Sequence, residues 1–372
     1  MVRPRLLIAL ASFLSTPLFA QAPAGPVAPQ QGVTPQAPPP QAAVKVRVAL
    51  VTTPATVHNS KGEMVHDLEA SDFRLTDNGV AQRIVHFDLG GDPLSIVVAI
   101  ENSSRVEPML PQVQKSGIVI SETVMGGSGE AAILAFNDDV QRLQDFTSSG
   151  DSIERAVETL KTGTSGTKLY DAMAQGVEML TSRPEPTADS PGRRRILLVI
   201  GEAEDDGSEM KFGDVLRRAQ LANVTIYSVG LSTTRAQLQE KPQDTTVHPT
   251  PPGTISRAPF PGSMPGPDTD ANLYGTGNLM HAVVWAIKHV KDAAKDNPLQ
   301  ILTMGTGGAH LATFKDRSIE KALDSIGGEL HSQYSLSYTP TGTSETGYHE
   351  INVMVKRKNL KVRARPGYYI AE

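Results

Sequence analysis

Four near-continuous apolar runs constrain the fold of this 372-residue chain more than any other feature. Runs of this kind suit strands that are buried on both faces of a parallel sheet. Amphipathic segments separate them, and the alternation of buried strands with helices is typical of a doubly wound α/β fold. The runs cover residues 94–100, 131–136, 196–200 and 224–231.

Helical patterns fill the gaps between these runs. The first begins at Asp151, where Glu154 completes a pattern resembling a capping box, and it stops before Gly163. We therefore predict a three-layer α/β domain over residues 92–334, with a mostly parallel, doubly wound sheet between two layers of helices. The other helical patterns cover residues 169–180, 212–219, 279–290 and 319–330.

Both flanks of this region carry β patterns. In the N-terminal flank, Asp77-Asn78-Gly79 lies between two short strand patterns, and an Asn-Gly pair in that setting is a strong hairpin signal. Because two-stranded hairpins alone are marginal in water, we predict that residues 44–91 and 335–372 pair into one small β-rich companion domain. The strand patterns cover residues 44–50, 73–75, 84–87, 334–338, 351–355 and 360–362.

The N-terminus has the pattern of an export signal. Basic residues occur within 1–5, an apolar run covers 6–14, and Leu18-Phe19-Ala20 precedes Gln21 as a small-residue cleavage pattern. No segment approaches the roughly 20 apolar residues that a membrane-spanning helix needs. We expect residues 1–20 to be a signal peptide and the protein to be periplasmic or extracellular, without a membrane span.

Composition separates two further segments and excludes one class of partner. Residues 21–43 are mostly Gln, Ala, Pro, Gly and Val, which predicts a disordered spacer, and residues 233–277 form a Pro-rich insertion loop. The chain has no cysteine, so its stability does not depend on disulfides. A formal net charge of −5 supplies no basic field for nucleic acid.

Three polar loops are candidates for a binding site. They cover residues 101–105 (ENSSR), 166–171 (GTKLYD) and 201–208 (GEAEDDGS). In an open α/β sheet, ligands bind beyond the carboxyl ends of the strands, near the point where the strand order reverses. We therefore expect these loops to meet at one rim of the sheet.

With sequence blocks in both flanks, these loops resemble the von Willebrand factor A (VWA) domain, and more closely the VWA-related proteins of Acidobacteria. Residues 68–87 (LEASDFRLTDNGVAQRIVHF) are similar to the family's N-terminal block, and residues 334–340 and 363–368 (RARPGY) to its C-terminal ending. The resemblance covers most of residues 44–370. It implies a metal-ion-dependent adhesion site, where an Asp-x-Ser-x-Ser loop, a Thr and a later Asp hold a divalent cation that a partner's carboxylate completes.

Carried over position by position, the ligand set that the resemblance implies is altered here. Ser103 and Thr167 match the first Ser and the Thr of the family. Glu101 and Glu202 stand in place of Asp, and Arg105 replaces the second Ser. Since Mg²⁺ holds its oxygen ligands at about 2.1 Å, an additional methylene disturbs the coordination. Arg105 also removes a ligand oxygen and adds a permanent positive charge.

We therefore expect no cofactor and a degenerate ligand site formed by Glu101, Ser103, Arg105, Thr167 and Glu202. In this hypothesis Arg105 takes the place of the cation and pairs with Glu101 and Glu202. The alternative is that Arg105 points into solvent and that Thr167 is only a helix N-cap. If Mg²⁺ or Mn²⁺ is bound, its ligands would be Glu101, Ser103, Thr167 and Glu202.

The sequence favours a binding protein over an enzyme, because no nucleophile with a nearby base can be identified. By resemblance, the expected role is adhesion-type binding of a protein or a surface ligand whose identity the sequence does not reveal. Three alternatives remain open at this point. They are an envelope assembly scaffold acting through the Pro-rich insertion, a divalent-metal-dependent adhesion protein, and a hydrolase in which Glu101 and Glu202 act as acid and base.

Overall fold

The computed structural model of the chain describes residues 50–184, 192–231, 298–313, 318–341 and 346–370. The predicted signal peptide, the spacer, the Pro-rich insertion and the helical pattern at 279–290 lie outside the described residues.

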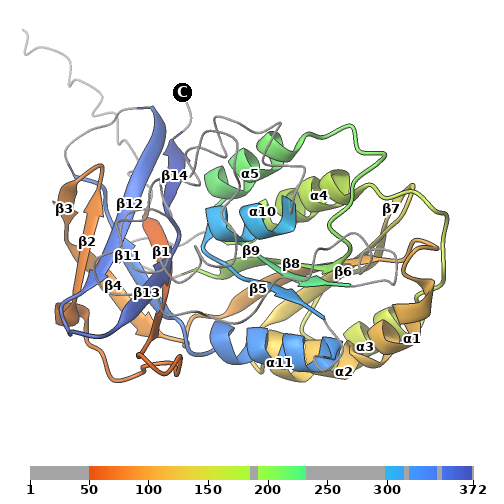
Figure 1. Cartoon of the computed structure of the whole chain (residues 1–372), viewed down its shortest axis with the longest axis horizontal. Helices are drawn as coiled ribbons and strands as arrows, with labels where there is room; N and C mark the ends of the chain where they lie inside the picture. The colour runs from red at the N-terminus through yellow and green to blue at the C-terminus, as the bar shows by residue number, and fades with distance from the viewer. Residues whose placement is uncertain (1–49, 185–191, 232–297, 314–317, 342–345, 371–372) are drawn as a thin grey trace, which may run out of the picture. The chain divides into compact units, whose positions relative to one another are not determined.

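A six-stranded sheet forms the centre of the α/β domain (Figure 1). Its strands are β5 (Leu94–Glu101), β6 (Glu130–Phe136), β7 (Val140–Thr147), β8 (Arg194–Gly201), β9 (Val224–Gly230) and β10 (His310–Ala312). They lie in the order β10-β9-β8-β5-β6-β7, and all neighbours are parallel except β7, which runs antiparallel to β6. The four apolar runs are the four inner strands, and every residue of β5 and β8 is buried. The strand order reverses at β5, which places the switch point beside the end of that strand.

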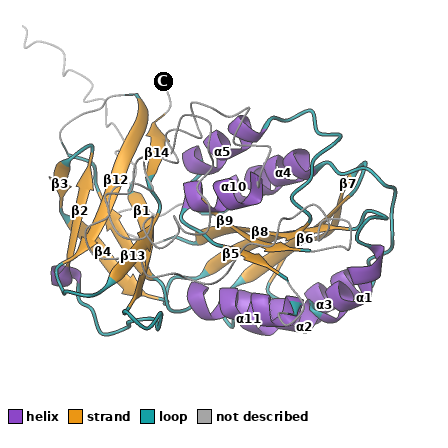
Figure 2. Ribbon diagram, viewed as in Figure 1, coloured by secondary structure: helices purple, strands orange, loops and turns teal. Residues whose placement is uncertain are grey.

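Helices cover both faces of this sheet (Figure 2). One face carries α4 (Leu169–Thr181), α5 (Phe212–Leu221) and α10 (Pro298–Thr306). The other carries α1 (Leu110–Lys115), α2 (Gly117–Val119), a π-helical turn η3 (Ile120–Met125), α3 (Gly150–Glu158) and α11 (Ile319–Leu330). Each face has its own apolar cluster, because side chains alternate between the two sides of every strand. The predicted three-layer, doubly wound fold is confirmed.

The start of α3 differs from the prediction. Ser149, not Asp151, is the N-cap, and its side chain accepts a hydrogen bond from the Ser152 N–H. Glu154 does not complete a capping box with Asp151, since its carboxylate accepts the Ser121 hydroxyl at 2.7 Å. An N-cap residue needs an extended backbone, and Ser149 has one, with φ −81° and ψ 109°.

Eight strands from the two flanks form two four-stranded antiparallel sheets. They are β1 (Val51–His58), β2 (Phe73–Asp77), β3 (Val80–Gln82), β4 (Ile84–Leu89), β11 (Tyr334–Tyr338), β12 (Gly347–Val355), β13 (Lys361–Ala364) and β14 (Gly367–Ile370). The orders are β13-β1-β11-β4 and β14-β12-β2-β3, so both sheets combine strands from the two flanks. One apolar cluster, which includes Phe73, Leu336 and Ile351, contains residues of both sheets. The companion domain built from both flanks is thus present.

The Asn-Gly turn joins a different pair of strands from the one predicted. Asn78 and Gly79 have φ of 46° and 79°, the left-handed conformation of a type I′ turn. The turn connects β2 to β3, and β4 leaves for the other sheet, where it pairs with β11. Of the predicted alternating strand at 44–50, only Leu50 is described, and the observed strand β1 begins at Val51.

Candidate functional site

The structure brings the three polar loops together at the carboxyl ends of β5 and β8. The first loop comprises residues 101–105 and the third residues 201–208, as predicted; the second, predicted as residues 166–171, comprises residues 161–168 in the structure, because helix α4 begins at Leu169. Ser104 donates its N–H to the Thr164 carbonyl at 2.9 Å, which joins the first loop to the second. The Thr167 hydroxyl donates to the Glu204 carbonyl at 3.0 Å, which joins the second to the third. The expected meeting of the loops at one rim is therefore observed.

Glu101 lies at the base of this rim and is fully buried. One carboxylate oxygen accepts the Ser103 hydroxyl at 2.6 Å, and the other accepts the Glu202 N–H at 2.6 Å. Burial raises the pKa of Glu101 to about 7, although these two hydrogen bonds lower it. The charge of Glu202 raises the pKa of Glu101 further, and the charge of Arg105 lowers it. Glu101 thus links the first loop to the third through hydrogen bonds at the buried base of the rim.

The two hydroxyl-bearing candidates are also buried. Ser103 is 1% exposed and Thr167 is 0% exposed, and both hydroxyl protons already have acceptors in the loops. Thr167 does not cap helix α4 with its side chain, because the N-cap of that helix is Lys168, which makes no side-chain cap. The predicted alternative role for Thr167 is therefore wrong.

Arg105 joins all three loops through its guanidinium. Its Nε donates to the Ser165 carbonyl at 3.0 Å, and its two terminal nitrogens donate to the carboxylates of Glu204 and Asp206. The prediction that Arg105 pairs with Glu101 and Glu202 was wrong, because the carboxylate partners of Arg105 are Glu204 and Asp206. Glu101 lies deeper, at the base of the rim, and its carboxylate oxygens already accept hydrogen bonds from the Ser103 hydroxyl and from the Glu202 N–H.

Carboxylates of the third loop that the predicted ligand set did not include organise the rim. Asp206 accepts the Thr167 N–H at 2.7 Å as well as the Arg105 guanidinium. Asp205 accepts the Tyr170 N–H at 3.1 Å, and Asp171 in turn accepts the Met210 N–H at 2.8 Å. The third loop and the start of α4 therefore cap each other. The acidic run at 204–206, facing a single arginine, is the sequence signal that could have identified these residues.

The carboxylate pair Glu101 and Glu202 does not have the geometry of an acid and base pair. Glu101 is 0% exposed and both its oxygens accept hydrogen bonds, while Glu202 is 7% exposed. A general acid or base must come within hydrogen-bond reach of the substrate, and the buried carboxyl of Glu101 cannot do so in this conformation.

The residues at the rim fit a divalent cation poorly. Such a cation needs several oxygen lone pairs directed at one point. Each carboxylate oxygen of Glu101 already accepts one hydrogen bond, so each keeps only one lone pair for a cation, while the hydroxyls of Ser103 and Thr167 donate their protons to Glu101 and to the Glu204 carbonyl and keep their lone pairs. The guanidinium of Arg105 carries its own positive charge into the same rim, where it would repel a metal ion.

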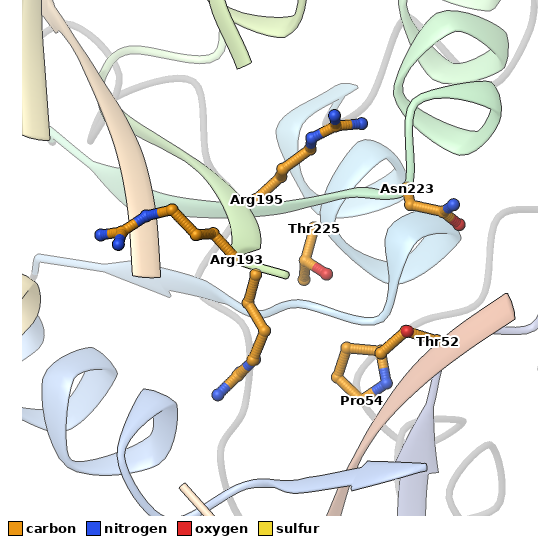
Figure 3. Close-up of a pocket in the computed structure, with 7 residues that line it drawn as sticks. Thr52, Pro54, Arg193, Arg195, Asn223 and Thr225 are labelled. Carbon is orange, nitrogen blue, oxygen red and sulfur yellow. The ribbon is translucent and has the colours of Figure 1, made fainter. Parts of the chain in front are cut away.

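A small cavity elsewhere in the chain does not form a second site. Its volume is about 20 Å³, enough for roughly one water molecule. Figure 3 shows that the head groups of Arg193 and Arg195 point in different directions, away from Thr52 and Pro54. The cavity is lined by Thr52, Pro54, Arg193, Arg194, Arg195, Asn223 and Thr225.

Comparison with known proteins agrees with this fold. The family model of the von Willebrand factor type A domain matches residues 96–248 of the chain. No curated protein matches the sequence.

Several solved structures are similar to the chain at low sequence identity. An aerotolerance-related membrane protein from Bacteroides fragilis is 13% identical, with a TM-score of 0.39, over 63% of this chain and 99% of that one. The conserved hypothetical protein BatB from Bacteroides thetaiotaomicron is 14% identical, with a TM-score of 0.36, over 64% and 98%. A von Willebrand factor type A protein from Catenulispora acidiphila is 10% identical, with a TM-score of 0.43, over 81% and 63%.

Within the described ranges, no helix combines the length and the apolar character needed to cross a membrane.

Proposed function

We propose that this chain is an exported, non-enzymatic binding protein of the adhesion type, which holds a protein or surface ligand at the rim formed by the three loops. The observation that carries the proposal is that Arg105 joins all three loops at the carboxyl ends of β5 and β8. Open α/β sheets bind their ligands at this place. Von Willebrand factor A domains are interaction modules, which supports binding rather than catalysis.

We infer further that the rim works without a metal ion, as a degenerate form of the adhesion site, and that the chain belongs with the VWA-related proteins of Acidobacteria. One guanidinium paired with two carboxylates supplies the positive charge that a dication supplies in relatives. Binding then depends on the shape and charge of the rim itself.

Calorimetric titration with Mg²⁺ and with Mn²⁺ tests the metal-free rim. We expect no heat of binding at micromolar concentrations for the natural chain. The matched control is the triple variant Glu101→Asp, Arg105→Ser and Glu202→Asp, which restores the family's ligands and should acquire binding. Micromolar binding by the natural chain would refute the proposal.

A site-specific cross-linker tests the binding role. A photoreactive amino acid replaces Ser104, which is exposed on the first loop, and in a matched control it replaces Ser128, which is exposed just before β6 at the opposite edge of the sheet. We expect one partner to be captured in cells from position 104 and not from position 128. The purified partner should then bind the chain in solution. Equal capture from both positions, or none from position 104, would argue against a rim-based function.

Export is a separate part of the proposal, and it rests on the pattern of residues 1–20. Mass spectrometry of the mature chain, isolated from periplasmic and extracellular fractions, should find an N-terminus at Gln21.

A further inference from the structure

We propose that the bridge from Arg105 to Glu204 and Asp206 is a latch that closes the rim, and that the polar side chains beneath it become accessible only when the guanidinium releases these two carboxylates. The inference concerns the regulation of the site in the proposed function. The test of the latch uses no ligand, so the latch and the proposed binding function can fail separately.

The latch adjoins buried polar groups that a ligand would need to reach. Glu101 and Thr167 are 0% exposed and Ser103 is 1% exposed, although all three belong to loops at the end of a sheet. The two residues held by Arg105 bracket Thr167, since the Thr167 hydroxyl donates to the Glu204 carbonyl and its N–H donates to Asp206. The rim as it stands therefore presents the ion pairs and conceals the hydroxyls.

The latch is built to be released easily. The Arg105 side chain is 22% exposed, and its partners Glu204 and Asp206 are 58% and 48% exposed. Ion pairs with this exposure are weak and are screened by salt. The hydrogen bonds of Glu101, in contrast, lie in the buried base of the rim and are protected from screening.

Opening the latch does not require the third loop to unfold. The loop remains attached to α4 through the bond from the Tyr170 N–H to Asp205 and the bond from the Asp171 N–H to the Ser208 hydroxyl. Neither bond involves Arg105. The guanidinium can therefore move away from Glu204 and Asp206 while the loops keep their positions.

The absence of cysteine from the natural chain permits a direct test, because a single introduced thiol reports its own exposure. Ser103→Cys is treated with a thiol reagent such as dithionitrobenzoate, with and without the further change Arg105→Ala. We expect slow labelling in the presence of Arg105 and labelling about tenfold faster in its absence, the change that the loss of two weak ion pairs would produce. Raising NaCl from about 0.05 M to about 1 M should accelerate labelling only in the chain that retains Arg105.

Three matched controls show whether the effect is specific to the latch. Ser104→Cys, at an exposed neighbouring position, should react fast with or without Arg105. Ala99→Cys, buried in β5, reports global opening and should stay slow in both backgrounds. Arg142→Ala, which removes a different exposed ion pair from Arg142 to Asp145, should leave the labelling rate of Ser103→Cys unchanged.

Equal labelling rates of the thiol at position 103 with and without Arg105, or fast labelling in both, would overturn the latch. If Ser103→Cys does not fold, Thr167→Cys supplies a second buried probe with the same expected result. A negative result here leaves the binding proposal standing, whereas failure to capture a partner leaves the latch standing.

Discussion

The carboxyl of Glu101 should make stability depend on pH in a defined window. Its pKa is raised from 4.5 to about 7 by burial. Between these two values the folded state retains the proton that the unfolded state releases, so the free energy of unfolding falls as pH rises. The loss begins above the unfolded pKa and is complete above the folded pKa.

The magnitude follows from the size of the shift. At 1.36 kcal/mol per pKa unit, the shift from 4.5 to about 7 corresponds to about 3 kcal/mol in all. Between about pH 5 and about pH 8, the expected change is about 2.5 kcal/mol. Glu101→Gln removes the titration and retains an uncharged group of the same shape, whose amide can still accept one of the two hydrogen bonds. The Ser103 hydroxyl can reverse and accept the other.

Urea unfolding followed by circular dichroism, at several pH values from about 5 to about 8, measures the effect. The free energy of unfolding of Glu101→Gln, minus that of the natural chain, should rise with pH across this window. Glu154→Gln is the matched control for the amide substitution, because Glu154 also accepts a serine hydroxyl, at 2.7 Å. If the difference for Glu101→Gln stays level from pH 5 to pH 8, the burial argument for this carboxyl is refuted.

Two further changes test the packing of the site and of the companion domain. Gly201→Ala places a Cβ 2.8 Å from a Glu101 carboxylate oxygen, so it should reduce the free energy of unfolding in urea by about 1–3 kcal/mol, while Gly127→Ala, which meets nothing within 4 Å, should change it by less than about 0.5 kcal/mol. A tolerated alanine at position 201 would show that Glu101 can move. Asp77→Asn disturbs a buried carboxylate that accepts the hydroxyls of Tyr338 and Tyr368, both at 2.8 Å, and pairs with His349 at 2.9 Å. It should lose about 2–4 kcal/mol in the same assay, against less than about 0.5 kcal/mol for the exposed Asp67→Asn, and equal effects would contradict this reading of the network.

The inner strands of the sheet could be predicted from the sequence because burial on both faces leaves a continuous apolar run. The edge strand β7 could not, since none of its residues is buried and most of them are polar. Helix α10 was missed for the opposite reason. It is buried along most of its length, so its sequence PLQILTMGT has no polar face to mark the helical period.

The site could be predicted only in part. That the three loops meet follows from topology, because the carboxyl ends of neighbouring parallel strands lie at one edge. The partners of Arg105 did not follow, since a long side chain can reach several carboxylates and the choice depends on which of them are already engaged. Glu101 is engaged by Ser103 and by the Glu202 N–H, and this left Glu204 and Asp206 for the guanidinium.

The pairing of strands from the two flanks has a consequence for folding order. Val51 pairs with Tyr338, and nearly the whole described chain lies between them in sequence. Leu89 and Tyr334 also pair, and they directly border the α/β domain. Once that domain has folded, its two exits are adjacent, and Gly90 donates its N–H to the Gln333 carbonyl at 3.0 Å. Folding of the α/β domain has then already closed the long loop between the two flanks, so the remaining strands can pair with little further loss of chain entropy. We therefore expect the central domain to fold first and its companion to assemble on it, so a mutation that slows the folding of the central domain should delay both.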